Sequence, residues 1–320
     1  MKIIVTGCSG FVGYYFVRLI AERFAGAQVL GIDFNAPAYD FDTSGISFRH
    51  QSINMMNQRE VTAALLDFRP EYIIHLAAFS SVGMSWKSPV ECFHNNTNII
   101  LYLLESLRET GLRCRLLSVG SSEEYGNVAA DQVPLHEDHR LDPVSPYAVA
   151  RTSQEMLSKV YTDGYGLDVV MTRSFNHIGP GQKPIFVVPS FAKQITEHKA
   201  SGASSGILRA GNVDIVRDFL DVRDVVEAYM ALLLKGRSGE VYNVCSGEGQ
   251  SLRTIIEMLA ACAEVNITVE RDESLIRPQD NMVIIGSNEK LRNETGWSRK
   301  HTVDQSLKDI LNYFSGQDGV

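Results

Sequence analysis

The sequence lacks any excess of positive charge. It contains 30 Lys and Arg residues against 38 Asp and Glu residues, and the formal net charge is −8. This balance argues against a nucleic-acid-binding surface, which needs basic side chains clustered on one face. An anionic ligand is therefore expected to be held by a few local arginines and lysines.

Paired cysteines and long apolar runs are also lacking. The five cysteines, Cys8, Cys92, Cys114, Cys245 and Cys262, are scattered without a C-x-x-C spacing. This suggests neither disulfides nor a metal site and suits a reducing cytosol. The first apolar run meets Gly7 too soon for a signal-peptide core, and no run of about 18 apolar residues is present to span a membrane. We therefore expect a cytoplasmic protein with no metal, nucleic-acid or membrane partner.

What the sequence does contain is a regular alternation of short apolar runs and longer amphipathic segments. Strand-like runs lie at 2–6, 28–33, 72–78, 114–120 and 167–173, and helix-like segments lie at 11–24, 57–68, 94–110 and 147–163. Repeated strand–helix–strand units predict a parallel sheet with helices on both faces. Strands that are apolar throughout are typical of such doubly covered sheets. The predicted fold class is α/β, with a Rossmann-type doubly wound parallel sheet.

The alternation becomes less regular after residue 174. A loop rich in Gly and Pro at 176–184 precedes helical segments near 188–200 and 221–236, a strand-like run at 241–247 and a mixed unit from 251 onward. We expect a dinucleotide-binding domain over 1–173. A smaller C-terminal α/β domain over 174–315 is expected to bind a second ligand, with parts of 211–247 returning to the main sheet.

A glycine-rich stretch, "TGCSGFVG", lies between the first predicted strand and the first predicted helix. Gly7, Gly10 and Gly13 allow a tight turn and a close approach of the backbone to a pyrophosphate, which the free N–H groups of the helix N-terminus attract. Asp33 ends the second strand about twenty residues later, where a carboxylate accepts hydrogen bonds from an adenosine ribose and repels a 2′-phosphate. The stretch predicts a nicotinamide dinucleotide site that favours NAD(H), with NADP(H) as the alternative.

A tyrosine and an arginine are spaced to share one face of a helix. Tyr147 and Arg151 are four residues apart, and Ser145 and Pro146 begin the helix. A neighbouring positive charge favours a phenolate, so such a tyrosine can exchange a proton with a carbinol or carbonyl oxygen. Ser121 and Ser122 follow a buried strand, where a parallel sheet presents its ligand crevice, and either hydroxyl could bind the same substrate oxygen.

At this point the chain resembles the extended short-chain dehydrogenase/reductases that act on nucleotide sugars. The resemblance rests on "TGCSGFVG", "HLAA", "SSEEYG" and "SPYAVAR", and it covers nearly the whole chain. In the second half, "RSFNHIGPGQ", "GNVDIVRDFLDVRDVVEAY", "VYNVCSG", "IRP" and "TGW" are most similar to GDP-4-dehydro-6-deoxy-D-mannose reductases. The resemblance implies a nucleotide-sugar substrate, with GDP favoured, and a homodimer built through helices 94–110 and 147–163.

The resemblance also implies roles for individual residues. Ser121 matches the catalytic serine or threonine of the family, and Tyr147 matches its acid/base. Arg151 stands where the family usually has lysine; arginine keeps the charge and the donors, but it is bulkier and is never deprotonated. The cofactor contacts expected from the resemblance, besides the three glycines and Asp33, are Phe11, Val12, Leu76, Ala77, Ala78, Tyr147 and Arg151. A second departure is "NNTNII" at 95–100, where the family often has Gly-Thr after the Asn.

Several reactions remain open on this scaffold. We favour reduction of a C4 ketone, in which Tyr147 gives the proton and Ser121 steadies the oxyanion. Glu123 occupies the position of the dehydratases' additional acid, so a GDP-mannose 4,6-dehydratase-like reaction is the alternative, followed by 4-epimerisation. The first loop and "RDFLDVRD" differ from what dehydratases typically carry. A dinucleotide-binding protein with impaired turnover is the remaining alternative, which Arg151 motivates. Glu124 is expected to be structural or solvated.

The resemblance implies four contacts to the nucleotide sugar: Asn176, Lys193, Arg217 and Arg277. The chemistry of the two arginines suits a pyrophosphate, because a guanidinium binds two phosphate oxygens at once. The preference for guanine comes only from the resemblance.

Overall fold

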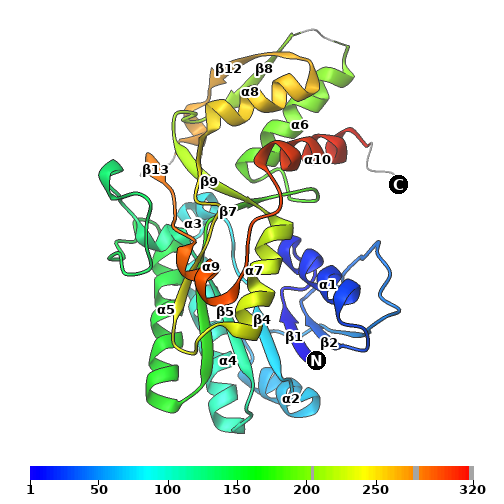
Figure 1. Cartoon of the computed structure of the whole chain (residues 1–320), viewed down its shortest axis with the longest axis vertical. Coiled ribbons are helices and arrows are strands. Elements are labelled where there is room, and N and C mark those ends of the chain that lie inside the picture. Colours follow the sequence, from blue (N-terminus) through cyan, green and yellow to red (C-terminus); the bar gives the residue numbers. More distant parts are fainter. Residues whose placement is uncertain (203–204, 277–280, 317–320) are drawn as a thin grey trace.

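A seven-stranded parallel β-sheet forms the larger part of the computed structural model (Figure 1), which describes residues 1–202, 205–276 and 281–316. Across the sheet the strands are β10 (Val241–Val244), β6 (Asp168–Ser174), β5 (Arg115–Ser121), β4 (Tyr72–His75), β1 (Lys2–Thr6), β2 (Gln28–Ile32) and β3 (Ser47–Gln51). The chain starts in the middle of the sheet, builds one side and then returns to build the other. The predicted Rossmann-type doubly wound sheet is therefore confirmed, with its switch point between β1 and β4.

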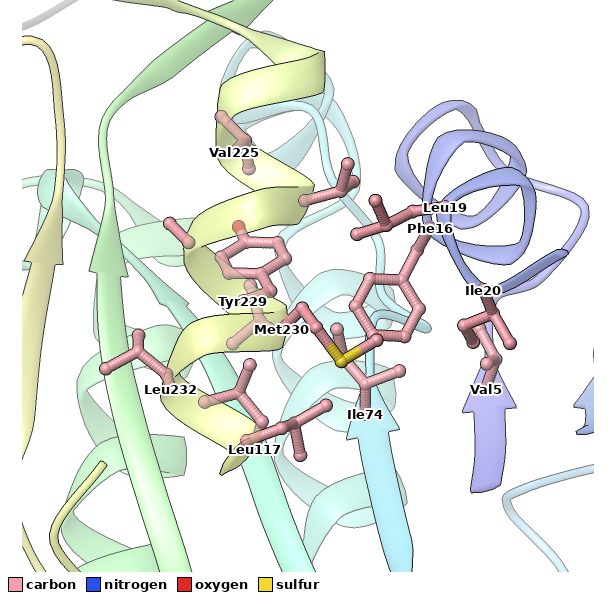
Figure 2. Packing of buried hydrophobic residues seen from close by; sticks show 14 of the residues in the cluster. Val5, Phe16, Leu19, Ile20, Ile74, Leu117, Val225, Tyr229, Met230 and Leu232 are labelled. Atoms are coloured by element: carbon pink, nitrogen blue, oxygen red, sulfur yellow. The ribbon is translucent and has the colours of Figure 1, made fainter. Parts of the chain in front are cut away.

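Helices cover both faces of this sheet, which explains why its central strands are apolar throughout. The helices α1 (Phe11–Arg23) and α7 (Val222–Lys235) lie on one face, and α2 (Gln58–Phe68), α4 (Pro89–Thr110) and α5 (Pro146–Tyr165) lie on the other (Figure 1). Successive strand residues point to opposite faces, so Ile3 and Val5 join the apolar cluster under α1 and α7 while Ile4 joins the cluster under α2 and α4. Figure 2 shows Phe16, Tyr229 and Met230 filling the space between α1, α7 and the strands.

Strand β3 and the start of α4 differ from the sequence-based expectation. The β3 segment, "SFRHQ", has one large apolar residue because it lies at the sheet edge, so it carries no strong strand pattern. Helix α4 begins at Pro89, ahead of the expected residue 94. The expected strand at 72–78 ends at His75, and the next three residues leave the sheet and line a cleft.

The C-terminal part contains two small sheets and a third apolar core. One sheet comprises β7 (Asn176–Ile178), β9 (Val216–Asp221), β11 (Gly249–Ser251) and β13 (Val283–Ile284), and the other comprises β8 (Ser205–Ala210) and β12 (Asn266–Arg271). The core is formed with α6 (Val187–Ala200), α8 (Leu252–Ala263) and α10 (Val303–Ser315). The remaining elements are α3 (Val82–Lys87), α9 (Glu289–Thr295), η1 (Ser122–Tyr125), η2 (Ala130–Gln132) and η3 (Glu273–Leu275).

The chain crosses between the two parts within 211–247. Strand β9 pairs in the four-stranded sheet, whereas α7 packs on the main sheet and β10 pairs with β6 at its edge. The return to the main sheet thus begins with α7. The domain boundary at residue 173 stays a prediction. Among the helices described, none has the length and apolar character that crossing a membrane requires.

Candidate active site

A cleft of about 2340 Å³ lies where the carboxyl ends of β1, β2, β4 and β5 face the C-terminal part. Such ends, at a switch point in the strand order, are where open parallel sheets bind ligands. Most residues that the sequence assigns to a site line this one cleft: Gly7, Gly10, Phe11, Val12, Gly13, Asp33, Leu76, Ala77, Ala78, Ser121, Glu123, Tyr147, Arg151, Asn176 and Arg217.

The glycine loop between β1 and α1 has the shape of a phosphate cradle. Gly7 adopts a φ of +72°, and a Cβ there would lie 2.8 Å from the backbone nitrogen of Ala77. A Cβ on Gly13 would overlap the carbonyl oxygen of Gly7, so only glycine lets α1 approach the loop. Gly10 caps α1 without a side chain, which leaves the first N–H groups of the helix for an anion. These residues fit the pyrophosphate of a dinucleotide.

Asp33 lies just beyond β2 with its carboxylate beside the glycine loop. Its oxygens accept hydrogen bonds from the backbone N–H of Ser9 at 3.1 Å and of Asn35 at 3.3 Å. The side chain is partly exposed and lines the cleft. A carboxylate at this place presents acceptors and negative charge to whatever binds beside α1.

Tyr147 and Arg151 lie together at the start of α5, as their spacing predicts. Ser145 caps the helix by accepting from the N–H of Ala148 at 3.1 Å, and Pro146 occupies the first turn. The guanidinium carbon of Arg151 lies 5.2 Å from the centre of the Tyr147 ring, within the range of a cation–π contact. Both side chains are buried and both line the cleft.

Ser121 ends β5 and caps the short helix η1. Its Oγ accepts from the N–H of Glu123 at 3.3 Å. Its own backbone N–H donates to Oε1 of Glu124 at 2.7 Å. Glu123 lines the cleft beside Ser121, whereas Glu124 points into the protein interior and is fully buried.

Glu124 contributes to this site by holding the backbone of Ser121. From the sequence it was expected only to be structural or solvated. Burial and the neighbouring carboxylate of Glu155, which pairs with Arg173 at 2.7 Å, raise the pKa of Glu124 well above its ordinary value. The protonated acid can donate from its second oxygen while its first oxygen holds the backbone of Ser121. The two consecutive glutamates of "SSEEYG" look alike in sequence, and only the turn of η1 separates their environments.

A buried polar row behind the cleft was also missed. Thr6, His75 and Ser118 are register partners on β1, β4 and β5, so their side chains lie on the same face of the sheet. Burial lowers the pKa of His75 to about 3, and the charge of Arg151 acts in the same direction. A polar residue in an otherwise apolar strand, as in "YIIHLAA", was the available signal.

The four residues assigned to the nucleotide sugar do not all meet at the cleft. Asn176 begins β7 and lines the cleft. Arg217 is buried on β9, lines the cleft, and donates to the carbonyl oxygens of Val216 and Asn281 at 2.9 and 2.7 Å.

Lys193 is not among the residues that line the cleft, and its contact with the nucleotide sugar stays a prediction. Its side chain is half exposed on α6 and pairs with Glu197 at 3.7 Å, one helical turn farther along. On this helix Ser190 and Phe191 face the cleft instead. Arg277 and most of the "IRP" motif lie outside the described residues.

Comparisons with known proteins show what the chain is similar to. A family model described as GDP-mannose 4,6 dehydratase matches residues 4–310. The chain is 35% identical over 310 residues to GDP-6-deoxy-D-mannose reductase of Pseudomonas aeruginosa, a match that covers 97% of this chain and 96% of that protein. Among solved structures, RMD from Pseudomonas aeruginosa complexed with NADPH is 32% identical with a TM-score of 0.86 and covers 99% of this chain and 100% of that one. UDP-glucose 4-epimerase of Thermus thermophilus, in complex with NAD, is 29% identical with a TM-score of 0.86 and covers 99% of both chains.

Proposed function

The chain belongs to the GDP-mannose 4,6-dehydratase family of extended short-chain dehydrogenase/reductases, and we propose that it reduces the C4 keto group of a GDP-4-keto-6-deoxy-hexose. It is a nucleotide-sugar oxidoreductase. One observation carries hydride chemistry at C4: Ser121, Tyr147 and Arg151 line the same cleft as the glycine loop. The choice of reduction rests on the similarity to GDP-6-deoxy-D-mannose reductase. A ketone in that cleft thus has a proton donor, an oxyanion donor and a fixed positive charge beside it.

A reduced nicotinamide dinucleotide, when bound along the glycine loop, supplies the hydride that reduces the ketone. Tyr147 gives its phenolic proton to the C4 oxygen, and Ser121 donates a hydrogen bond to the same oxygen as negative charge develops there. Arg151 stabilises the phenolate that Tyr147 leaves behind, since its guanidinium lies beside the ring. The buried position of Tyr147 and Arg151 strengthens this electrostatic support.

We propose that NADH is preferred over NADPH. The relatives do not decide this, because RMD is complexed with NADPH and the epimerase with NAD. The proposal rests on Asp33, whose carboxylate lies beside the glycine loop and would repel a 2′-phosphate.

The GDP-sugar itself is proposed to lie between the two parts of the molecule. Asn176 on β7 and Arg217 on β9 line the cleft from the C-terminal part and carry an amide and a guanidinium. A guanidinium suits the second pyrophosphate of the ternary complex. The assignment of guanine rests on the similarity to GDP-6-deoxy-D-mannose reductase.

A second candidate reaction, 4,6-dehydration, is kept because of Glu123. Its side chain lines the cleft next to Ser121, where it could act as an additional acid at C6 of the sugar. The two reactions differ in product: dehydration consumes a GDP-hexose without net use of NADH, whereas reduction consumes the keto sugar and NADH together.

We also propose that the protein acts as a cytoplasmic homodimer. All five cysteines are free, as in a reducing compartment. Large apolar side chains are exposed on the outer faces of α4 and α5: Val90, Phe93, Val149, Met156 and Val160. Apolar side chains gathered on two packed helices favour burial against a second copy.

The test mixes the protein with NADH and GDP-4-keto-6-deoxy-mannose and follows the loss of nicotinamide absorbance. Wild-type protein should consume NADH in proportion to ketone, and Tyr147→Phe should do so far more slowly. Parallel incubation with GDP-mannose and NAD⁺ tests for dehydration by the appearance of the keto sugar. If the protein binds NADH tightly but turns over neither substrate, the proposal fails and a dinucleotide-binding role replaces it.

A further inference from the structure

The Arg151 guanidinium is held by a specific set of acceptors on one side. Its Nη1 donates to the carbonyl oxygen of Val119 at 3.1 Å and to Oε1 of Gln154 at 2.7 Å. Its Nε is buried and has no hydrogen-bond partner within the residues that the structure describes. One nitrogen is thus anchored on β5 and α5, and other N–H groups of the fork are left for the ring of Tyr147 and the cleft.

Gln154 can present only its oxygen to Arg151. Its Nε2 donates to Oγ of Ser118 and to the carbonyl oxygen of Val119, both at 3.0 Å. A carbonyl oxygen accepts and never donates, so the amide nitrogen must face Val119, and the amide oxygen must face the guanidinium. Gln154 is 1% exposed, which places this contact away from water, where a lost partner is costly.

A lysine at position 151 would meet these acceptors differently. Its ammonium is a single nitrogen, whereas the guanidinium can bond Val119 and Gln154 through Nη1 and still offer Nε and Nη2 elsewhere. An ammonium that bonded both acceptors would keep one N–H for the phenol and the cofactor, whereas the guanidinium keeps three. The acceptor pair therefore favours arginine over lysine.

We propose that Gln154 is a positioning residue that adapts this active site to arginine in place of lysine. It holds the guanidinium beside Tyr147 without touching substrate or cofactor. The inference rests on the proposed function where turnover is measured. NADH affinity is a second measurement that does not depend on turnover.

The test is a double-mutant cycle of wild type, Gln154→Met, Arg151→Lys and Arg151→Lys/Gln154→Met. Methionine keeps the length and volume of glutamine and removes its acceptor together with the two Nε2 hydrogen bonds, a loss that is common to both backgrounds and cancels in the cycle. Each protein is assayed for kcat, for KM of NADH and for NADH affinity by nicotinamide fluorescence. Ser153→Ala is the control, because Ser153 lies one residue earlier on α5 and its hydroxyl, among the residues described, bonds only the carbonyl oxygen of Val149.

Gln154→Met should lower kcat about tenfold in the Arg151 protein, while the same change in the Arg151→Lys protein should leave kcat unchanged or raise it. NADH affinity should follow the same pattern, and Ser153→Ala should match wild type. An equal loss in both backgrounds would mean that Gln154 supports only folding, and the inference would be overturned. If no protein turns over but the binding cycle is non-additive, the proposed reaction fails while the positioning role stands. Gln154→Ala provides a second acceptor-free variant should the methionine protein not fold.

Discussion

Replacing His75 should remove a large part of the acid sensitivity of the folded state. The ring is 1% exposed, and its Nδ1 lies 2.9 Å from Oγ1 of Thr6. That oxygen also accepts from the backbone N–H groups of Leu76 and Ala77 at 3.1 and 3.2 Å. Both of its lone pairs are then used, so its single proton goes to Nδ1, and the ring must be neutral with its own proton on Nε2.

The size of the effect follows from the pKa of His75, which burial lowers from 6.5 to about 3. A group whose folded-state pKa is lowered contributes stability above its unfolded pKa and loses it as pH falls toward the folded value. The window for His75 therefore runs from 6.5 down to about 3. Between pH 7.5 and pH 4.5, protonation of the unfolded chain alone should cost about 2.7 kcal/mol of unfolding free energy.

The assay is urea unfolding of wild type and His75→Gln at these two pH values, followed by circular dichroism. Glutamine does not titrate, and its amide oxygen can accept from Thr6. The loss of unfolding free energy on acidification should be about 2.7 kcal/mol smaller in the variant than in wild type. Other groups, such as Asp218, whose pKa burial raises to about 6, act in both proteins and cancel in the difference. His94→Gln, on the exposed side of α4, controls for replacing a histidine. Identical pH dependence in wild type and His75→Gln would refute the argument.

Four further outcomes are expected. Tyr147→Phe should lower kcat at least about 100-fold while NADH affinity, measured by fluorescence, changes little; comparable rates would contradict the acid role. Asp33→Ala should raise the ratio of kcat/KM for NADPH to that for NADH by about tenfold or more, because the repelling charge is gone; an unchanged ratio would remove Asp33 as the determinant. Because burial and a neighbouring carboxylate raise the pKa of Glu124, its contribution to stability is present at low pH and is lost as pH rises through that raised value. The Tm of wild type should therefore fall more than that of Glu124→Gln as pH rises from 4.5, the ordinary pKa of the group, to pH 9, and parallel curves would argue against a protonated acid. Met156→Glu, at a position 57% exposed on α5, should convert a dimer to a monomer in light scattering; a dimer that persists would place the interface elsewhere.

Local patterns were sufficient for the strand-and-helix succession and for part of the site. The glycine loop, the Ser145–Pro146 helix start and the Tyr147–Arg151 spacing each depend on residues within a few positions of one another. Because backbone geometry and capping chemistry act over that range, their outcome can be predicted from sequence. The carboxyl ends of parallel strands then bring these pieces to one edge of the sheet.

The remaining features depend on contacts between residues that are distant in the chain. Glu123 and Glu124 are neighbours of the same type, yet one lines the cleft and the other is buried beside Glu155. The spacing of residues also gives no sign that Lys193 pairs with Glu197 on α6 or that it is not among the residues lining the cleft.

The sequence by itself determined the Rossmann-type sheet, the glycine loop and the tyrosine–arginine pair, because these arise from short-range periodicity and turn chemistry. Only the tertiary structure decided that Gln154 and the Val119 carbonyl accept hydrogen bonds from Arg151, and that His75 is neutral. Those properties come from desolvation and from hydrogen-bond partners on other strands and helices. The spacing of residues along the chain predicts neither the desolvation nor the partners.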